Sequence, residues 1–313
     1  MTLEVRPPLP EDAGAVAALV NAYDAAFGGD GGWTDADVED EWRTASAEPA
    51  DVWLVERAEQ LAGHATLHPT GGGRLQALGW THPVHAGYGV GSVLVDVAER
   101  RAIELAGSVV VRNSVLAADR AACRLLEDRG YAAASQSLRM RLDLQTPPPP
   151  ARPPPGIALA SFRPGVDDAE VDACVEEAFE RRWTHQAQWR QAKAAERRFD
   201  PEVWIVAREG GEVCGVVLCT VQTFGMGFVE SLAVLAPWRG RGIGTALLDE
   251  ALRRLWAAGE RSVGLSVDGD NPGAIRLYER AGMHVAWAAV QYERELGEAR
   301  ADTGGRSSAR VPV

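Results

Sequence analysis

A loop rich in glycine and arginine is the feature of this sequence with the clearest chemical potential. It reads Arg-Gly-Arg-Gly-Ile-Gly over residues 239–244, after an apolar stretch and before an amphipathic one. Glycines let backbone N–H groups approach an anion closely, and the positive end of a following helix adds to the attraction. The guanidinium groups of Arg239 and Arg241 can donate charge-assisted hydrogen bonds to phosphate oxygens. The loop is therefore suited to hold a pyrophosphate.

Two other kinds of phosphate-binding loop are alternatives for residues 239–244. A dinucleotide-binding loop should follow the first strand of a doubly wound sheet, with an acidic residue about 20 positions later, whereas several expected strands and a helix come first here. A Walker loop needs a lysine directly after its glycines, and Thr245 and Ala246 follow instead. Taken alone, the loop could also be a tight strand-to-helix turn without a ligand.

Tyr278 is the best candidate for a general acid. It lies on the inward face of a short predicted helix that Asn271 would cap and Gly282 would end. A phenol in this place could protonate a leaving group. It could equally be a core residue whose hydroxyl binds a backbone group.

Glu230 is the best candidate for a general base. In a regular strand it would share one face with Phe228, Leu232 and Val234. Apolar neighbours desolvate a carboxylate and raise its pKa toward the range that a base needs. The alternatives are a solvated charge on an edge strand, with a water chain to another residue acting as the base.

The two halves of the chain resemble each other at an offset of about 152 residues. Residues 51–55 match residues 202–206, and the glycines of residues 89–91 match those of residues 242–244. The common order and spacing of such pairs indicate an internal duplication, with a period far longer than that of solenoid repeats. We therefore expect two copies of one domain.

Both copies have the same expected order of elements, a first helix followed by strands, a glycine loop, a long helix and further short elements. This order predicts a mixed α/β fold. The first helix is expected at residues 12–26 and 168–181, and the next strands at 52–55, 61–67, 203–206 and 213–221. The expected division is an N-terminal domain (1–144), a semi-rigid proline-rich linker (145–156), a C-terminal domain (157–296) and a disordered tail (297–313).

The composition limits the classes of protein and partner. The 313 residues are 46% hydrophobic and 24% charged, which suits two folded cores and excludes wholesale disorder. A net charge of −12 argues against nucleic acid as a partner and mildly favours amines. Without an apolar run of ~20 residues or a signal-peptide pattern, we expect a cytoplasmic protein with no membrane contact. The spacing of the four cysteines predicts neither a disulfide framework nor a metal site.

Residues 239–244 and 271–283 resemble the two signature motifs of the GNAT superfamily of N-acetyltransferases. The first matches the R/Q-x-x-G-x-G/A acetyl-CoA pyrophosphate loop, and the second matches an asparagine before a short helix that carries a tyrosine and ends in glycine plus an apolar residue. The resemblance implies two tandem domains, each a mostly antiparallel central sheet flanked by helices, with acetyl-CoA as co-substrate and no metal. The implied acetyl-CoA contacts are Leu232, Ala233, Val234, Arg239, Gly240, Arg241, Gly242, Ile243, Gly244, Thr245, Asn271 and Tyr278.

The family also gives the candidate side chains their roles. Its tyrosine protonates the departing thiolate, which implies that role for Tyr278, and its bulged strand implies an oxyanion donor among the backbone N–H groups of residues 232–234. In several members the base lies two positions before Glu230, where this sequence has Phe228. In the same superfamily the region after the first helix often contributes to the acceptor site, so Trp183 and Trp189 either line an acceptor cleft or pack against the sheet.

The first copy departs from this pattern at the chemical positions. Opposite Glu230, Arg239 and Tyr278 stand Ala77, Ala86 and Leu126. We therefore predict that the first copy is catalytically silent. Its glycines survive, so a second cofactor site could be formed by Gly87, Tyr88, Gly89, Val90, Gly91 and Ser92. The histidines of this copy lack the spacing of a metal site, and we interpret them as structural.

Together these features predict an N-acetyltransferase that moves an acetyl group from acetyl-CoA to a primary amine of a small molecule or peptide, with the chemistry in the second copy. The tandem layout is similar to that of the mycothiol synthase family, which gives one more specific alternative. The other alternative is a non-catalytic module that binds or senses acyl-CoA. No residue pattern identifies the acceptor or indicates an oligomeric state.

Overall fold

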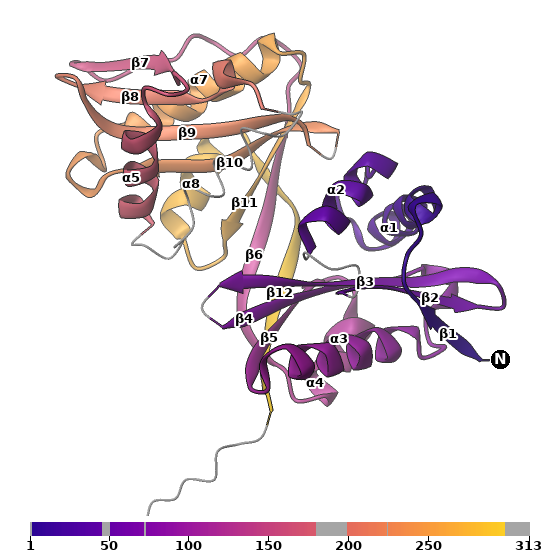
Figure 1. Cartoon of the computed structure of the whole chain (residues 1–313). Coiled ribbons are helices and arrows are strands. Elements are labelled where there is room, and N and C mark those ends of the chain that lie inside the picture. Colours follow the sequence, from indigo (N-terminus) through magenta and orange to yellow (C-terminus); the bar gives the residue numbers. More distant parts are fainter. Residues whose placement is uncertain (1, 46–50, 72, 180–198, 224, 298–313) are drawn as a thin grey trace, which may run out of the picture.

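The described residues fold around one twelve-stranded sheet that runs through both halves of the chain (Figure 1). The computed structural model describes residues 2–45, 51–71, 73–179, 199–223 and 225–297. The helices are α1 (Ala13–Phe27), α2 (Asp35–Ala45), α3 (Val90–Ala106), α4 (Arg120–Asp128), α5 (Asp168–Ala178), α7 (Ile243–Ala257) and α8 (Pro272–Arg280). The strands are β1 (Leu3–Arg6), β2 (Val52–Arg57), β3 (Gln60–Gly71), β4 (Arg74–Thr81), β5 (Val109–Leu116), β6 (Ala132–Asp143), β7 (Ile157–Ser161), β8 (Ile205–Glu209), β9 (Glu212–Thr223), β10 (Met226–Val234), β11 (Ser262–Asp268) and β12 (His284–Leu296).

Most of the expected elements form near their predicted positions, and the mixed α/β fold is confirmed. The strand expected at residues 203–206 begins only at Ile205, after a short 3-10 helix at Pro201–Val203. In α1, Val16, Val20 and Tyr23 are buried at the spacing of one helix face. The helix ends at Gly28, whose φ of 81° is the left-handed conformation that glycine adopts readily. In the part of the chain that the structure describes, no helix is both long and apolar enough to cross a membrane.

The last strand of each copy lies next to a strand of the other copy. The strand order is β1-β2-β3-β4-β5-β12-β6-β11-β10-β9-β8-β7. Strand β12 pairs antiparallel with β5, and β6 pairs antiparallel with β11. Accordingly, Met140 of β6 is buried in the core of the C-terminal half, and Tyr292 of β12 is buried in the core of the N-terminal half. This exchange joins the sheets of the two copies into one.

We expect Tyr292→Ala to destabilise the N-terminal half, although Tyr292 belongs to the second copy in sequence. The substitution leaves a cavity beside α4 and removes the hydrogen bond from its hydroxyl to Glu127 (2.9 Å). Loss of a buried aromatic side chain costs about 3–5 kcal/mol. Hydrogen exchange read by mass spectrometry should show faster exchange in α4 and β5. Faster exchange confined to β11 and α7 would mean that each copy keeps its own last strand.

Helices cover both faces of the sheet in each half (Figure 1). In the N-terminal half α1 and α2 lie on one face and α3 and α4 on the other; in the C-terminal half α5 lies opposite α7 and α8. The parallel pairs β4–β5 and β10–β11 stop pairing partway, after Ala77–Asn113 and Val229–Leu265. Beyond these points, the backbone groups on the β5 side of β4 and on the β11 side of β10 have no partner strand.

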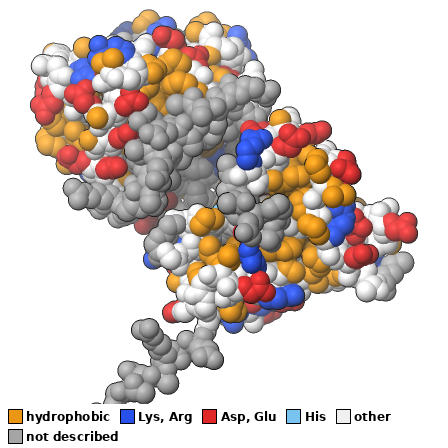
Figure 2. Space-filling model, viewed as in Figure 1, with side chains coloured by type: hydrophobic (Ala, Val, Ile, Leu, Met, Phe, Trp, Pro, Cys, Tyr) orange, Lys and Arg blue, Asp and Glu red, His pale blue; other side chains and the backbone are white. Residues whose placement is uncertain are grey.

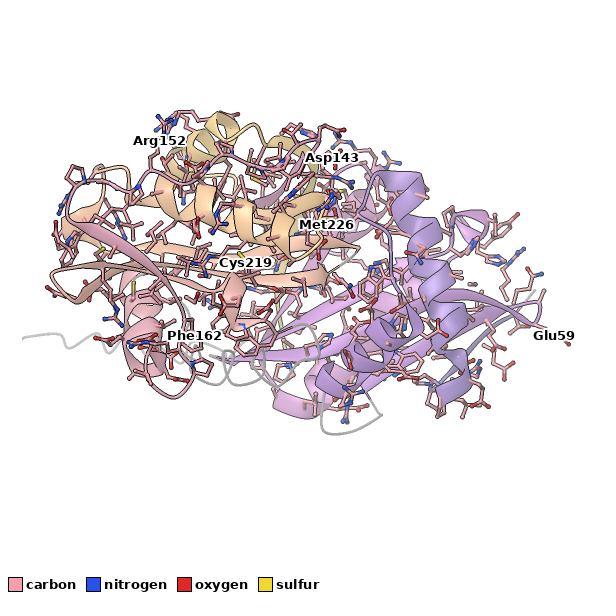
Figure 3. All side chains as sticks on the ribbon, turned by 90° about the horizontal axis from the view of Figure 1, so that it is seen from above. Glu59, Asp143, Arg152, Phe162, Cys219 and Met226 are labelled. Carbon is pink, nitrogen blue, oxygen red and sulfur yellow. The ribbon has the colours of Figure 1, made fainter. Side chains whose placement is uncertain are left out.

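The linker runs beside the glycine loop of the second copy. Residues 144–156 contain no helix or strand, and Cγ of Pro154 lies 3.7 Å from where a Cβ on Gly242 would be. In Figure 3, Arg152 of the linker lies on the α7 and α8 side of the sheet, and Phe162 lies on the α5 side. On the described part of the face in Figure 2, acidic and basic side chains are interspersed and the basic ones form no broad area.

Candidate active site

The glycine loop has the backbone geometry of an anion site. Gly240 and Gly242 have φ values of 76° and 86°, which other residues rarely adopt, and Gly242 is the N-cap of α7. The first helical hydrogen bond is donated by Ala246 N–H to the Gly242 carbonyl, at 3.1 Å. The N–H groups of residues 243–245 precede it and have no acceptor within the helix. They can therefore bind an anion together with the helix dipole.

Both loop arginines contact protein acceptors. Arg239 donates from Nε to the Val234 carbonyl (2.9 Å) and from a terminal nitrogen to the Ala178 carbonyl (3.0 Å). Arg241 forms an ion pair with Glu209, and hydrogen bonds from Arg241 and Trp238 hold the pKa of Glu209 below its usual value. These contacts connect the loop to α5, β8 and β10 and use only some of the N–H donors of each guanidinium. The backbone N–H groups of residues 243–245 are further donors in the loop.

Strand β10 contains a bulge at Glu230. Val229 lies opposite Cys219 of β9, and Ser231 lies opposite Leu218, so Glu230 is an extra residue on the β10 side. A bulge of this kind leaves one residue outside the ladder and bends the strand. Strand β10 lies between β9 and β11 in the sheet, and Glu230 directly follows the last residue of β10 that pairs with β11.

The bulge reverses which residues of β10 face which layer. Leu232 and Val234 approach Gly244 of α7, at 3.7 and 3.8 Å from where its Cβ would be. The ring of Phe228, in contrast, faces the guanidinium of Arg139 on β6. A regular strand would place residues 228, 230, 232 and 234 on one face, so that prediction is wrong.

The first copy has no bulge at the corresponding place. In β4, Ala77 lies opposite Leu67 and the next residue, Leu78, lies opposite Thr66, without a register shift. Ala77 and Val229 are each the last residue that pairs with the parallel neighbour, so they are structural counterparts. The alignment of Ala77 with Glu230 is therefore wrong, because Glu230 is an insertion that has no counterpart in the first copy.

A hydroxyl and a cation lie beside Glu230. Thr220 Oγ1 on β9 donates a hydrogen bond to Glu230 Oε1 at 3.1 Å. The guanidinium carbon of Arg139 lies 4.5 Å from the centre of the Phe228 ring. Burial lowers the pKa of Arg139, and the charges of Asp30 and Glu230 oppose this shift. Figure 3 labels Cys219 and Met226 on β9 and β10, the strands that carry this cluster.

Neither of these neighbours of Glu230 could be predicted from the sequence. Thr220 lies within an apolar strand and has no motif around it. Arg139 belongs to the last strand of the first copy, and the strand exchange brings it into the range in which the charge of Glu230 acts on its pKa. Pairing between strands of different copies has no local sequence signal.

Tyr278 lies in α8, close to the start of α7. Asn271 caps α8, as predicted, by accepting a backbone N–H at 3.0 Å, and Gly282 follows the helix with φ 92°. The Tyr278 side chain is 7% exposed, and burial raises the pKa of its phenol to about 12. The preceding residue, Leu277, lies 3.5 Å from where a Cβ on Gly244 would be. The bulged strand, the loop helix and the tyrosine helix therefore meet at Gly244.

The first copy keeps the loop but lacks the chemical side chains. Gly87 and Gly89 have φ values of 81° and 84°, and α3 starts at Val90 in the same way as α7 starts at Ile243. Tyr88 is exposed, with the Arg57 guanidinium carbon 3.6 Å from its ring centre. The place of Tyr278 is occupied by Leu126, which is buried in the core.

Two tryptophans and the histidines of the first copy were also considered from the sequence. Trp183 and Trp189 fall within residues 180–198, outside the described residues. His64 is fully buried in the N-terminal half, with its ring stacked on Trp80 at 5.5 Å, and His68 contacts Thr66 at 2.8 Å.

Comparison with known proteins gives a consistent result for both copies. The model of the acetyltransferase (GNAT) family matches residues 16–131 and residues 169–283. A mycothiol acetyltransferase of Kineococcus radiotolerans is 33% identical over 302 residues, which cover 91% of this chain and 94% of that protein. The mycothiol acetyltransferase of Sanguibacter keddieii is 32% identical over 266 residues, which cover 79% of this chain and 82% of that protein.

Two solved structures are similar over most of their length. A GCN5-related N-acetyltransferase from Sphaerobacter thermophilus has a TM-score of 0.84 and 34% identity, and the match covers 95% of this chain and 97% of that one. A tandem GNAT protein from the clavulanic acid biosynthesis pathway has a TM-score of 0.74 and 19% identity, with 95% and 100% covered. The second likeness concerns the fold alone.

Proposed function

This chain belongs to the GNAT acetyltransferase family and is an N-acetyltransferase, and we propose that its C-terminal half transfers an acetyl group from acetyl-CoA to a primary amine of a small molecule. One observation carries the proposal. Gly244 brings together the anion-binding loop, the bulged strand with Glu230 and the helix with Tyr278. The first copy has the loop without the other two features.

The proposed cofactor contacts follow from the free backbone groups. N–H groups of residues 240–245, at the positive end of α7, hold the diphosphate of acetyl-CoA. On the β11 side, the backbone of Leu232, Ala233 and Val234 has no strand partner, because pairing with β11 ends at Val229. These groups can hydrogen-bond the amides of the extended arm that carries the thioester.

The proposed roles of the side chains follow from their surroundings. Glu230, directly or through a water molecule, accepts the proton that the acceptor ammonium must lose. A backbone N–H released from the ladder near the bulge stabilises negative charge on the acetyl oxygen. Tyr278 donates its proton to the departing sulfur, and its raised pKa keeps that proton in place at neutral pH.

The relatives favour a small molecule over a peptide as acceptor, since two are named mycothiol acetyltransferases. A mycothiol-related acceptor is the specific alternative that these names suggest. A cytoplasmic location agrees with the need for acetyl-CoA. Release of free thiol from acetyl-CoA, measured with a panel of small-molecule amines and peptides, tests the proposal. Tight acetyl-CoA binding without thiol release on any amine would instead indicate a sensing module.

We expect Gly242→Val to abolish turnover and the equivalent Gly89→Val to leave it unchanged. Gly242 has φ 86°, so a β-branched residue there costs about 1–3 kcal/mol of backbone strain and moves the loop N–H groups. Gly89 has nearly the same φ, 84°, which makes the pair closely matched. Calorimetry on both variants also tests the second cofactor site. If the wild type binds two acetyl-CoA per chain, Gly89→Val should bind one. Equal losses of turnover would contradict a silent first copy.

A further inference from the structure

A cavity of ≈ 160 Å³ lies in the N-terminal half, at the place where β4 and β5 stop pairing. Residues 78–80 of β4 and residues 114 and 116 of β5 line it, together with α1, the segment before α2, and the exchanged strands β6 and β12. It is the first copy's counterpart of the region that holds Glu230 in the second copy. The copy around it lacks the bulge and the tyrosine, so the cavity has no acyl-transfer machinery of its own.

Aromatic rings form much of the cavity wall. Trp33, Trp80, Trp287 and Tyr23 all line it. The rings of Trp33 and Trp80 lie 6.0 Å apart at 68°, and Trp80 is also stacked on His64. The indole N–H of Trp287 donates to Asp30 Oδ1 at 2.9 Å, which fixes its ring. Indole faces attract cations, more strongly where water is excluded.

The charges of the cavity also favour a cation. Two carboxylates line it, those of Asp24 and Asp30, with a single guanidinium, that of Arg139. Arg139 Nε lies 2.8 Å from Asp30 Oδ2, and the side chains of this pair are 9% and 6% exposed. Asp24, 9% exposed, accepts a backbone N–H from Gly31 at 3.0 Å. The lining thus holds two carboxylates and one guanidinium, so negative charge is in excess.

We propose that this cavity is a second ligand site, which binds a small organic cation with its ammonium group toward Asp24 and its carbon skeleton against Trp33, Trp80 and Trp287. The volume is close to that of an engineered protein cavity of about 150 Å³, which holds one benzene molecule. A six-membered ring with one ammonium group therefore matches the cavity in size. None of the residues proposed for acetyl transfer lines the cavity, so we expect its occupancy not to require acetyl-CoA.

The test uses two probes of the same shape, cyclohexylammonium and cyclohexanol, titrated into the full chain by calorimetry. Cyclohexylammonium should bind at least about tenfold more tightly than the alcohol, since charge and ring faces act together. Asp24→Asn keeps the shape and an acceptor for Gly31 N–H, and should weaken the ammonium at least about tenfold. Ser114→Leu fills the cavity without changing its charges and should abolish binding of both probes.

Three further results decide the assignment. Asp96→Asn, at an exposed carboxylate of α3, should not alter binding, and neither should Glu230→Gln. Thermal melting checks that each variant is folded. If Asp24→Asn is not folded, the binding result for Ser114→Leu decides the outcome. Equal affinity for the two probes, or no binding of either, would overturn the proposal. Binding that is lost in Glu230→Gln and kept in Asp24→Asn would also overturn it, because the amine would then lie at the catalytic site.

Discussion

Tyr278→Phe is expected to lower kcat for acetyl transfer by about 10²- to 10⁴-fold, the usual contribution of a general acid or base. The substitution removes one hydroxyl and keeps the buried ring, so the packing of α8 against α7 should persist. Without that proton, coenzyme A must leave as a thiolate. Steady-state kinetics with thiol detection gives kcat, and calorimetry should show unchanged affinity for acetyl-CoA.

Tyr292→Phe is the matched control. Tyr292 is also buried, and its hydroxyl donates to Glu127 at 2.9 Å, but it lies in the N-terminal half. Loss of this hydrogen bond should lower the free energy of unfolding by about 0.5–1.5 kcal/mol and leave kcat unchanged. If the two variants have the same kcat, the phenol of Tyr278 takes no part in the reaction.

The pH dependence gives a second test of the same phenol. Burial raises the pKa of Tyr278 from 10.0 to about 12, so the acid stays protonated over the alkaline range in which an ordinary tyrosine ionises. We therefore expect kcat to stay level between about pH 8 and 10 rather than fall to half near the ordinary tyrosine pKa. A kcat that declines through pH 10 in the wild type and not in Tyr278→Phe would assign the phenol an unshifted pKa.

Changes at Glu230 should also lower activity strongly, and two variants separate its two proposed contributions. Glu230→Gln keeps the bulge and removes the base, so kcat/KM at neutral pH should fall by about 10²- to 10⁴-fold. Deletion of Glu230 removes the bulge as well and gives β10 the regular register of β4. The deletion should add the loss of an oxyanion donor, typically about 10²- to 10³-fold in kcat.

The comparison of the two Glu230 variants has distinct outcomes. A strong effect of the deletion with a weak effect of Glu230→Gln would mean that the bulge matters and that the base is another group or a water chain. Full activity in both would contradict the proposed site. Val229→Ala is the control for packing, because the Val229 side chain is buried directly before the bulge and has no ionisable group.

Those parts of the site whose geometry is set within one element could be predicted from the sequence. Gly240 and Gly242 adopt left-handed backbone, and Asn271 caps α8, because these properties depend on the residue and its nearest neighbours. The duplication was visible for the same reason, since each copy repeats its own local signals. The family resemblance then supplied roles for Tyr278 and the loop.

The position of Glu230 could not be predicted in the same way. A bulge is a property of the hydrogen-bond register between two strands, and β10 reads as an ordinary apolar strand when it is considered alone. Because the sequence alone does not reveal the inserted residue, it aligns Ala77 with Glu230, whereas Val229 is the structural counterpart of Ala77. The insertion also reverses which face of the sheet each later residue of β10 occupies. The proximity of Thr220 to Glu230 follows from that register.

The sequence by itself determined the element order, the loop, the helix caps and the presence of two related copies, because each is set by contacts over a few residues. The tertiary structure decided which half receives β6 and β12, a choice that depends on packing between residues far apart in the chain. Both strands are long and pair on both sides, so either sheet offers them a full set of backbone partners. Through that choice the charge of Glu230 in the second copy acts on Arg139 of the first, and Trp287 of the second lines the cavity of the first.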